Sequence, residues 1–375
     1  MLNKQIRVLQ VLGGLNPGGA ETMIMNYYRH IDKTQIQFDF IIHSNRNDKQ
    51  FYEDEIKKMG GNIFHLPKYF VLNHFSYKRK WKRFFKEHPD YKIIHGHMRS
   101  TASIYLKIAK KFGLKTISHS HSMDNGNGIK AVVRNFLCGK IVKYSDYFVA
   151  CSNDAAVWLF GPSILNSSKY ILLKNAIELS KYRFDPKIRK IVRKELDINN
   201  EFVIGHVGRF CTQKNHEFLI DLFKKMNDDS NINLRLILVG TGELRDRIVE
   251  KSIDYKIIDK IIFLENRSDV NEILQAFDIF CFPSIHEGLG IAAIEAQASG
   301  LPTIISNFVP SDTIVTKNVY KLPLDISLWE ENIRRIYSLQ FERCFNYEDL
   351  RLAGYDINNE IKKLEKLYLN ICNWG

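Results

Sequence analysis

Short apolar runs alternate with longer segments whose apolar residues recur at helical spacing through the first half of the chain. The expected strands are 6–12, 38–42, 63–66, 91–95, 115–118 and 147–150. The expected helices follow residue 21 and cover 53–59, 75–88, 100–112 and 129–143. This alternation predicts a doubly wound, mostly parallel sheet, whose functional groups lie beyond the carboxyl ends of the strands.

The second half repeats this pattern after a charged, polar linker within 177–200. Its expected strands are 202–207, 234–239, 261–264, 279–282 and 302–306. A length of 375 residues fits two domains, which we place at 1–178 and 179–356. Residues 341–375 contain an amphipathic helix, whose final part we place at about 357–375.

Composition favours a folded protein without a membrane span. Hydrophobic residues make up 45% of the chain, enough for two cores, and no apolar run approaches the length of a transmembrane helix. The N-terminus leads directly into a strand, so we expect no signal peptide. Six cysteines show no metal-ligand spacing and predict reduced thiols in the cytoplasm.

Positive charge is concentrated in the first half. Residues 1–180 hold 27 Lys and Arg against 13 Asp and Glu, whereas the remainder holds 27 against 29. Such a basic domain could bind nucleic acid, an anionic membrane or an acidic substrate, or its charge could serve only to keep the surface soluble. The helix at 75–88 combines aromatic residues at helical spacing with six Lys and Arg residues, and is either a buried crossover helix or a contact with an anionic membrane.

Two carboxylates flank a glycine-rich turn and helix at 283–300. Glu287 lies in the turn and Glu295 lies eight residues further, about two helical turns, so both can face one side. Gly288 and Gly290 open the helix, where free N–H groups favour a diphosphate. For either residue alone, a purely structural role is as plausible as a functional one: Glu287 would be a capping acid at the helix start, and Glu295 a solvated carboxylate on the helix.

Two further loops follow the first strand of each half. Gly208, Arg209 and Lys214 stand after strand 202–207, where two cations can converge on one anion. Gly18 and Gly19 stand between strand 6–12 and a helix, a phosphate-approach geometry that lacks the dinucleotide and P-loop spacings.

Alternate histidines end two neighbouring strands. These are His95 with His97 and His119 with His121. Such pairs are either structural or metal ligands, but the sequence places no third ligand close enough to predict a metal site.

The spacing Glu287-x7-Glu295 followed by Ala-x-Ala-x-Gly-x-Pro resembles the signature of the retaining glycosyltransferases of family four. This resemblance implies the GT-B fold, with two Rossmann-like domains facing a cleft and a C-terminal helix that crosses back to the first domain. It also implies an enzyme that moves a sugar from a nucleotide sugar, with a uridine diphosphate donor expected.

The resemblance assigns roles to the donor-side residues. Glu287 is expected beside the donor sugar, and Glu295 on the ribose. The diphosphate is expected at Gly18, Gly19, Gly208, Arg209, Lys214, Leu289 and Gly290. Arg267 is expected near the base. Neither a metal nor another cofactor is expected, because these groups can stabilise the departing diphosphate and no Asp-x-Asp motif stands in a suitable loop.

The resemblance also assigns the first domain. Counting from Gly113 places His121 at the family's active-site histidine, with His119 beside it, and His95 and His97 look like an acceptor-side wall. The opening of the chain looks most like bacterial capsular and exopolysaccharide transferases, which implies an undecaprenyl-diphosphate-linked acceptor. We therefore expect a cytoplasmic enzyme at the inner face of the membrane.

Two departures and two alternative functions remain. Glu265 replaces a glycine that the family has near the base, and 307–311 replaces a Gly-rich acidic segment, which leaves base and sugar contacts open. A basic nucleic-acid binder is the alternative of another class, although no nucleic-acid motif accompanies the charge. The other alternative is a sugar-nucleotide-binding module without activity.

Overall fold

The chain folds into two compact α/β units. The computed structural model describes residues 5–44, 49–121, 140–228 and 232–373. The first unit comprises Met1–Ala176 and Ile357–Gly375, and the second comprises Ile177–Asp356. The change of unit after Ala176 lies two residues before the predicted boundary.

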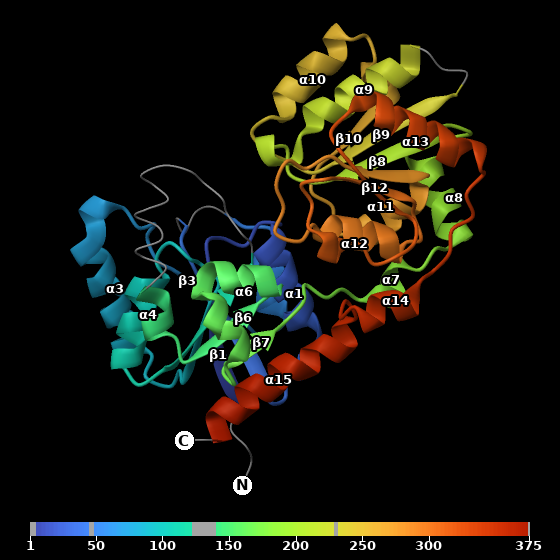
Figure 1. Ribbon diagram of the computed structural model, residues 1–375. Helices are drawn as coiled ribbons and strands as arrows, with labels where there is room; N and C mark the ends of the chain where they lie inside the picture. Colours follow the sequence, from blue (N-terminus) through green and yellow to red (C-terminus); the bar gives the residue numbers. More distant parts are fainter. Residues whose placement is uncertain (1–4, 45–48, 122–139, 229–231, 374–375) are drawn as a thin grey trace. The chain divides into compact units, whose positions relative to one another are not determined.

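The first unit is built on a seven-stranded parallel sheet in the order β3-β2-β1-β4-β5-β6-β7 (Figure 1). The strands are β1 Ile6–Leu12, β2 Ile36–Ile42, β3 Ile63–His65, β4 Ile93–Gly96, β5 Lys115–Ser120, β6 Tyr147–Ala150 and β7 Tyr170–Leu172. Strand β1 is central because all seven of its residues pair with β2 on one side and four of them pair with β4 on the other. Its residues from Val8 onward are buried.

Helices cover both faces of this sheet. They are α1 Gly19–His30, α2 Glu53–Lys58, α3 His74–Glu87, α4 Ala102–Lys111, α6 Asn153–Phe160 and α15 Ile357–Asn373, with 3-10 turns η1 Val71–Asn73 and η2 Pro162–Asn166. Helices α1, α2 and α15 bury their apolar residues in one core, and α3, α4 and α6 in the other. The predicted helix at 129–143 lies mostly outside the described residues.

Helix α15 packs on the first unit although it ends the chain. Ile361, Leu364, Leu367, Tyr368 and Ile371 recur at helical spacing and are buried in the core that α1 and β1 share. The hydroxyl of Tyr368 lies 3.1 Å from Gln10 Nε2 on β1, which adds a buried polar contact to this packing. The predicted return of the terminal helix to the first domain is confirmed.

The second unit contains a six-stranded parallel sheet in the order β10-β9-β8-β11-β12-β13. The strands are β8 Phe202–Val207, β9 Leu234–Val239, β10 Ile261–Leu264, β11 Ile279–Phe282, β12 Thr303–Ser306 and β13 Val319–Leu322. The helices are α7 Leu179–Tyr182, α8 Pro186–Glu195, α9 His216–Asp228, α10 Arg245–Asp254, α11 Val270–Ala276, α12 Ile291–Ala298, α13 Ile326–Ser338 and α14 Tyr347–Leu352. The 3-10 turns are η3 Thr212–Lys214, η4 Ile258–Lys260 and η5 Ser311–Thr313.

The two parallel, doubly wound sheets confirm the predicted fold class, and the elements differ from the prediction mainly at their ends. Strand β12 begins at Thr303 rather than at Pro302, because proline has no N–H to donate to a neighbouring strand. Strand β5 runs on to Ser120 and therefore carries His119 within the sheet. His97 and His121 follow the carboxyl ends of β4 and β5, so the direction of each strand determines where these residues lie.

Candidate functional site

The turn between β11 and α12 is shaped by Gly290. Its φ of 82° lies in the left-handed region, and a Cβ there would come within 2.8 Å of Phe282 Cε1 on β11. Gly290 is the N-cap of α12 and offers no capping side chain. The first N–H groups of a helix point outward unpaired and carry a partial positive charge, so this helix start, with Leu289 immediately before it, suits an anion.

Glu287 and Lys214 form an ion pair at this turn. Lys214 Nζ lies 2.5 Å from Glu287 Oε1, and the two side chains are only 17% and 7% exposed. The same ammonium lies 4.5 Å from the ring centroid of Phe282, a cation–π contact. The sequence predicted both residues in one site, and the structure shows that they contact each other directly.

Gly208 gives the lysine room to reach this position. A Cβ at Gly208 would lie 3.3 Å from Lys214 Cδ and 2.8 Å from Nε2 of His206. Both distances are shorter than ordinary van der Waals contact, so a larger residue would displace the Lys214 stem or the buried His206 ring. The position after β8 therefore favours glycine for a steric reason.

Glu295 lies about one turn into α12 and is buried, with 7% of its surface exposed. The hydroxyl of Tyr182 at the end of α7 donates a hydrogen bond of 2.8 Å to its Oε1. Burial raises the pKa of Glu295 to about 7, and the Tyr182 hydrogen bond opposes this rise. Tyr182 was missed because it lies in the segment expected to be a linker, where a single tyrosine gives no signal in the sequence.

The two predicted arginines have acidic partners at other places in the second unit. Arg209 Nη2 lies 2.9 Å from Glu243 Oε2, and both side chains are more than half exposed. Such an exposed pair contributes little stability, so the Arg209 guanidinium can turn toward an anion at small cost. Arg267 contacts Asp269 at 2.6 Å, and this hydrogen bond raises its pKa further above the ordinary value.

In the first unit, Gly18 is the N-cap of α1 and Gly19 its first residue. A Cβ at Gly18 would come within 2.5 Å of Glu21 Oε2, whereas a Cβ at Gly19 would contact nothing. Helices α1 and α12 both start without a capping side chain. The role of both glycines at the diphosphate stays a prediction.

The four predicted histidines form one group at the carboxyl ends of β4 and β5, in which His95, His97 and His119 are buried and His121 is partly buried. His97 Nδ1 lies 2.7 Å from His121 Nε2, and His97 Nε2 lies 2.8 Å from Gln10 Oε1. Burial lowers the pKa of His95 and of His121 to about 3, and it lowers the pKa values of His97 and His119 as well. These rings are therefore neutral at physiological pH.

This grouping changes two expectations. The sequence placed no third metal ligand near the histidine pairs, but one ring nitrogen from each of His95, His97 and His119 lies within 4.8 Å of the others. His95 and His119 are 0% and 1% exposed, so neither side chain offers an acceptor an open surface. The assignment of His95, His97 and His119 to an acceptor wall stays a prediction, and so does the catalytic role of His121.

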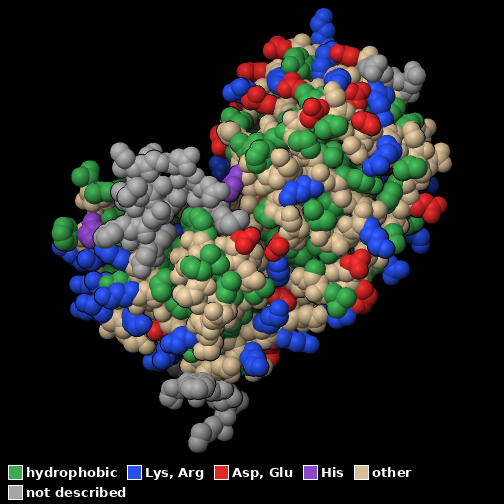
Figure 2. Space-filling model, in the orientation of Figure 1, with side chains coloured by type: hydrophobic (Ala, Val, Ile, Leu, Met, Phe, Trp, Pro, Cys, Tyr) green, Lys and Arg blue, Asp and Glu red, His purple; other side chains and the backbone are tan. Residues whose placement is uncertain are grey.

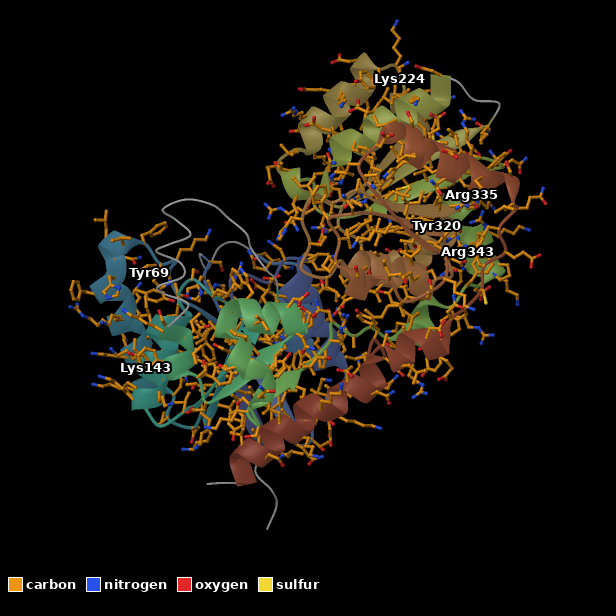
Figure 3. The ribbon with its side chains drawn as sticks, viewed as in Figure 1. Tyr69, Lys143, Lys224, Tyr320, Arg335 and Arg343 are labelled. Atoms are coloured by element: carbon orange, nitrogen blue, oxygen red, sulfur yellow. The ribbon has the colours of Figure 1, made fainter. Side chains whose placement is uncertain are left out.

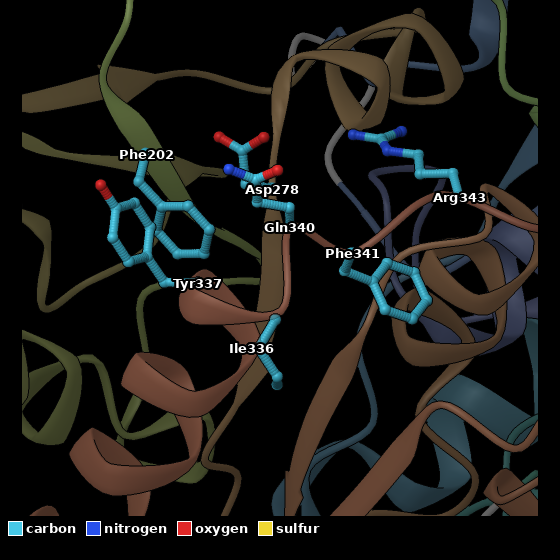
Figure 4. A pocket seen from close by; sticks show the side chains of 7 residues that line it. All are labelled: Phe202, Asp278, Ile336, Tyr337, Gln340, Phe341 and Arg343. Carbon is cyan, nitrogen blue, oxygen red and sulfur yellow. The ribbon is translucent and has the colours of Figure 1, made fainter.

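A separate pocket of about 220 Å³ lies near the amino ends of β8 and β11 (Figure 4). It is lined by Phe202, Asp278, Ile336, Tyr337, Gln340, Phe341 and Arg343. Asp278 pairs there with Arg189 and Arg193 at 2.6 Å and 3.3 Å. Because Glu287 and Glu295 follow the carboxyl end of β11, this pocket lies at the opposite edge of the sheet from them.

An exposed surface on the first unit joins apolar and basic side chains. We call it the α3 patch; it comprises Phe70, Val71, Leu72 and Phe75 with Lys78, Arg79, Lys80, Lys82, Arg83 and Lys86. Leu72 is fully exposed and Val71 82% exposed. Figure 2 shows Lys and Arg gathered over this part of the first unit, and Figure 3 places Tyr69 beside α3.

The buried face of α3 is its aromatic face. Tyr77, Trp81, Phe84 and Phe85 are buried in the sheet core, as the crossover-helix interpretation predicts. That interpretation leaves the apolar residues of the α3 patch unexplained, because they point to solvent. Among the described residues, no helix has both the length and the apolar composition that crossing a bilayer requires.

The fold is that of the GT-B glycosyltransferases. The crystal structure of Anabaena HepE in complex with UDP and glucose superposes with a TM-score of 0.79, over 97% of this chain and 99% of that one, at 15% identity. Residues 17–181 match the model for Glycosyltransferase Family 4, and residues 188–343 match the model for Glycosyl transferases group 1.

Relatives of nearly full length agree with these models. EpsF of Bacillus subtilis (strain 168), named as a glycosyltransferase, is 33% identical over 98% of this chain and 97% of its own. CapH of Staphylococcus aureus, a capsular polysaccharide biosynthesis glycosyltransferase, is 23% identical over 97% and 99%. The Escherichia coli UDP-Gal:alpha-D-GlcNAc-diphosphoundecaprenol alpha-1,3-galactosyltransferase is 25% identical over 75% and 76%. The chain belongs to glycosyltransferase family 4.

Proposed function

We propose that the chain transfers a sugar from a UDP-sugar to a saccharide linked to undecaprenyl diphosphate, with retention of the anomeric configuration. The observation that carries this proposal is the Lys214–Glu287 pair at the uncapped start of α12, with Glu295 about one turn into that helix. The UDP in the HepE crystals and the donor and acceptor named for the E. coli relative support the choice of substrates.

Departure of the diphosphate is the step that the second unit would assist. Negative charge builds on the leaving phosphate, and fixed positive groups lower its energy without rearranging during the reaction. Lys214, the Gly290 helix start and the exposed guanidinium of Arg209 supply that charge. No metal ion is required for this step, which therefore proceeds in the presence of a chelator.

Glu287 has two tasks in this proposal. Its carboxylate holds Lys214 in place through the 2.5 Å contact, and it accepts hydrogen bonds from the donor sugar. Glu295 accepts hydrogen bonds from the ribose hydroxyls once it has lost its proton. Because burial raises the pKa of Glu295 to about 7, ribose binding and deprotonation are coupled near neutral pH.

The first unit would hold the acceptor. Its excess of Lys and Arg suits a diphosphate-linked substrate and an anionic membrane surface, and the α3 patch adds exposed apolar side chains that can enter the interfacial layer. The enzyme would then work at the cytoplasmic face of the membrane in capsule or exopolysaccharide synthesis. Attack by the acceptor hydroxyl on the donor face that the diphosphate leaves accounts for retention, with His121 positioning the sugar.

Transfer is the direct test. Full-length protein is incubated with UDP-glucose, UDP-galactose, UDP-N-acetylglucosamine or GDP-mannose and a short-chain polyprenyl-diphosphate saccharide, with EDTA or with magnesium. We expect one UDP-sugar to give a product of retained configuration by NMR, in both conditions. Inverted product, a requirement for magnesium or absence of any transfer would contradict the proposal, and binding of UDP without transfer would instead indicate a module without activity.

A further inference from the structure

Four imidazole rings are stacked at the carboxyl edge of the first sheet. Alternate residues of a strand point to one face, so His95 and His97 project together, as do His119 and His121. Strands β4 and β5 are parallel neighbours with Gly96 opposite Ser118, which brings His97 level with His119. The ring centroids of His95 and His97 lie 4.4 Å apart, and those of His95 and His119 lie 5.2 Å apart.

Several nitrogens in this group have nothing to bind within the described part of the chain. Nε2 of His95 and both ring nitrogens of His119 are buried there without a hydrogen-bond partner. A buried polar atom left unsatisfied costs about 1–3 kcal/mol, and native structures contain few. Three such atoms in one group therefore point to a ligand that satisfies them.

The donor set defines the chemistry of that ligand. One ring nitrogen each of His95, His97 and His119 lies within 4.8 Å of the other two. In a tetrahedral site with Zn–N bonds of about 2.1 Å, ligand nitrogens lie roughly 3.4 Å apart, so the nitrogens of this triad would have to approach one another by at most about 1.4 Å. A set made only of imidazoles suits zinc and its transition-metal neighbours and not magnesium or calcium.

Two of the three rings already have a polar partner on one ring nitrogen, as ligating histidines in metal sites usually do. His95 Nδ1 contacts the Tyr368 hydroxyl at 2.7 Å, and His97 Nε2 contacts Gln10 Oε1 at 2.8 Å. Partners on the far ring nitrogen fix the orientation of a ligating histidine. With Gln10 on Nε2, His97 has Nδ1 left for a metal, in place of the 2.7 Å contact of that atom with His121 Nε2.

We propose that His95, His97 and His119 bind one zinc ion, a site separate from the diphosphate site of the second unit. Neutral imidazole nitrogens are the form of histidine that binds zinc. Tyr368 lies on α15 and Gln10 on β1, so the site would tie the terminal helix to the sheet of the first unit. The proposal does not depend on which sugar is transferred, or on transfer at all.

The test measures metal on full-length protein after removal of any affinity tag. We expect about one zinc per chain by mass spectrometry, sub-micromolar affinity in competition with a chromophoric chelator, and a raised melting temperature with zinc but not with magnesium. Tyr368→Phe keeps all three ligands and should weaken zinc binding about tenfold. His119→Gln should weaken it by at least a hundredfold.

The matched control is His43→Gln. His43 is another buried histidine of the first unit, but its two nitrogens contact Leu12 O and the Tyr77 hydroxyl. Zinc stoichiometry should survive this change. Wild-type protein that neither retains zinc nor gains thermal stability from it would overturn the proposal, and so would equal zinc binding in wild type and His119→Gln. Should His119→Gln fail to fold, Tyr368→Phe and the wild-type measurement decide the question.

Discussion

Tyr182 donates a 2.8 Å hydrogen bond to Glu295, a residue 113 positions further along the chain, and thereby joins the end of α7 to the buried side of α12. The contact stabilises the ionised form of a carboxyl group that burial otherwise keeps protonated. Whether Glu295 is charged near neutral pH therefore depends on this tyrosine. The first two predictions follow from that relationship.

The raised pKa of Glu295 should make the folded protein less stable as the pH rises. Between its ordinary pKa of 4.5 and its folded value of about 7, the native state holds a proton that the unfolded chain has lost, so the free energy of unfolding falls by roughly 3 kcal/mol across this range. Glu295→Gln keeps the side chain neutral and should lack this decrease. Urea unfolding of both proteins from about pH 5 to about pH 8 measures it, with the exposed Glu331→Gln as control. Parallel pH profiles for wild type and Glu295→Gln would contradict the raised pKa.

Tyr182→Phe should move the pH dependence of nucleotide binding. Loss of the hydroxyl removes the hydrogen bond that favours the carboxylate, so the pKa of Glu295 rises further. UDP affinity at neutral pH should then fall several-fold, and the rise of affinity with pH should shift to higher pH. The loss of one hydrogen bond costs about 1 kcal/mol of stability. Titration calorimetry with UDP at several pH values measures the shift, and an unchanged profile would show that Glu295 does not titrate in this range.

Glu287→Gln should separate turnover from binding. The neutral amide holds Lys214 more weakly and accepts fewer hydrogen bonds from the donor sugar, and both changes matter most when charge builds on the diphosphate. We expect kcat to fall about 100-fold or more and the Kd for UDP to change less than about threefold. Steady-state transfer assays and calorimetry supply the two values. A loss of equal size in both would make Glu287 a binding residue only.

The α3 patch should bind anionic membranes. Replacing Lys78, Lys80, Lys82 and Arg83 by Glu reverses the charge next to the exposed apolar side chains and should abolish sedimentation with vesicles that contain phosphatidylglycerol. Each basic residue near such a surface contributes about 1 kcal/mol, so the effect should be large and salt-dependent. The matched control reverses four exposed lysines of the second unit, Lys187, Lys190, Lys194 and Lys317. Equal sedimentation of both variants would assign binding to general charge rather than to this patch.

The sequence predicts local geometry well at these sites because the helix and strand periods determine it. The alternate histidines lie at the carboxyl ends of β4 and β5 and Glu295 lies on α12, as their positions predict, whereas α12 begins only at Ile291, so Glu287 is not on the same helix as Glu295. Contacts between residues that are far apart in the sequence are not predicted in this way. The Lys214–Glu287 pair joins residues 73 positions apart, and Tyr182 reaches Glu295 only because α7 and α12 are neighbours.

The histidine group shows the same limit. Each pair was visible as an alternation along one strand, but the meeting of His95, His97 and His119 depends on the register that sets Gly96 opposite Ser118. A one-residue change of register would send one pair to the other face of the sheet. Strand register follows from packing of the whole sheet, so the sequence alone does not predict a third ligand.

Nucleotide binding by the second unit tests the central claim most directly. Thermal unfolding is followed with uridine, guanosine and adenosine diphosphates, each with EDTA and with magnesium, for wild type, Glu295→Ala and the control Glu331→Ala. At a hundredfold excess over Kd, binding adds about 2.7 kcal/mol, which should raise the melting temperature by about 5 °C or more. We predict this rise for the uridine nucleotide, independent of magnesium, kept in Glu331→Ala and lost in Glu295→Ala. No rise with any nucleotide, or an equal rise in Glu295→Ala, would contradict the assignment of this site to the UDP-sugar.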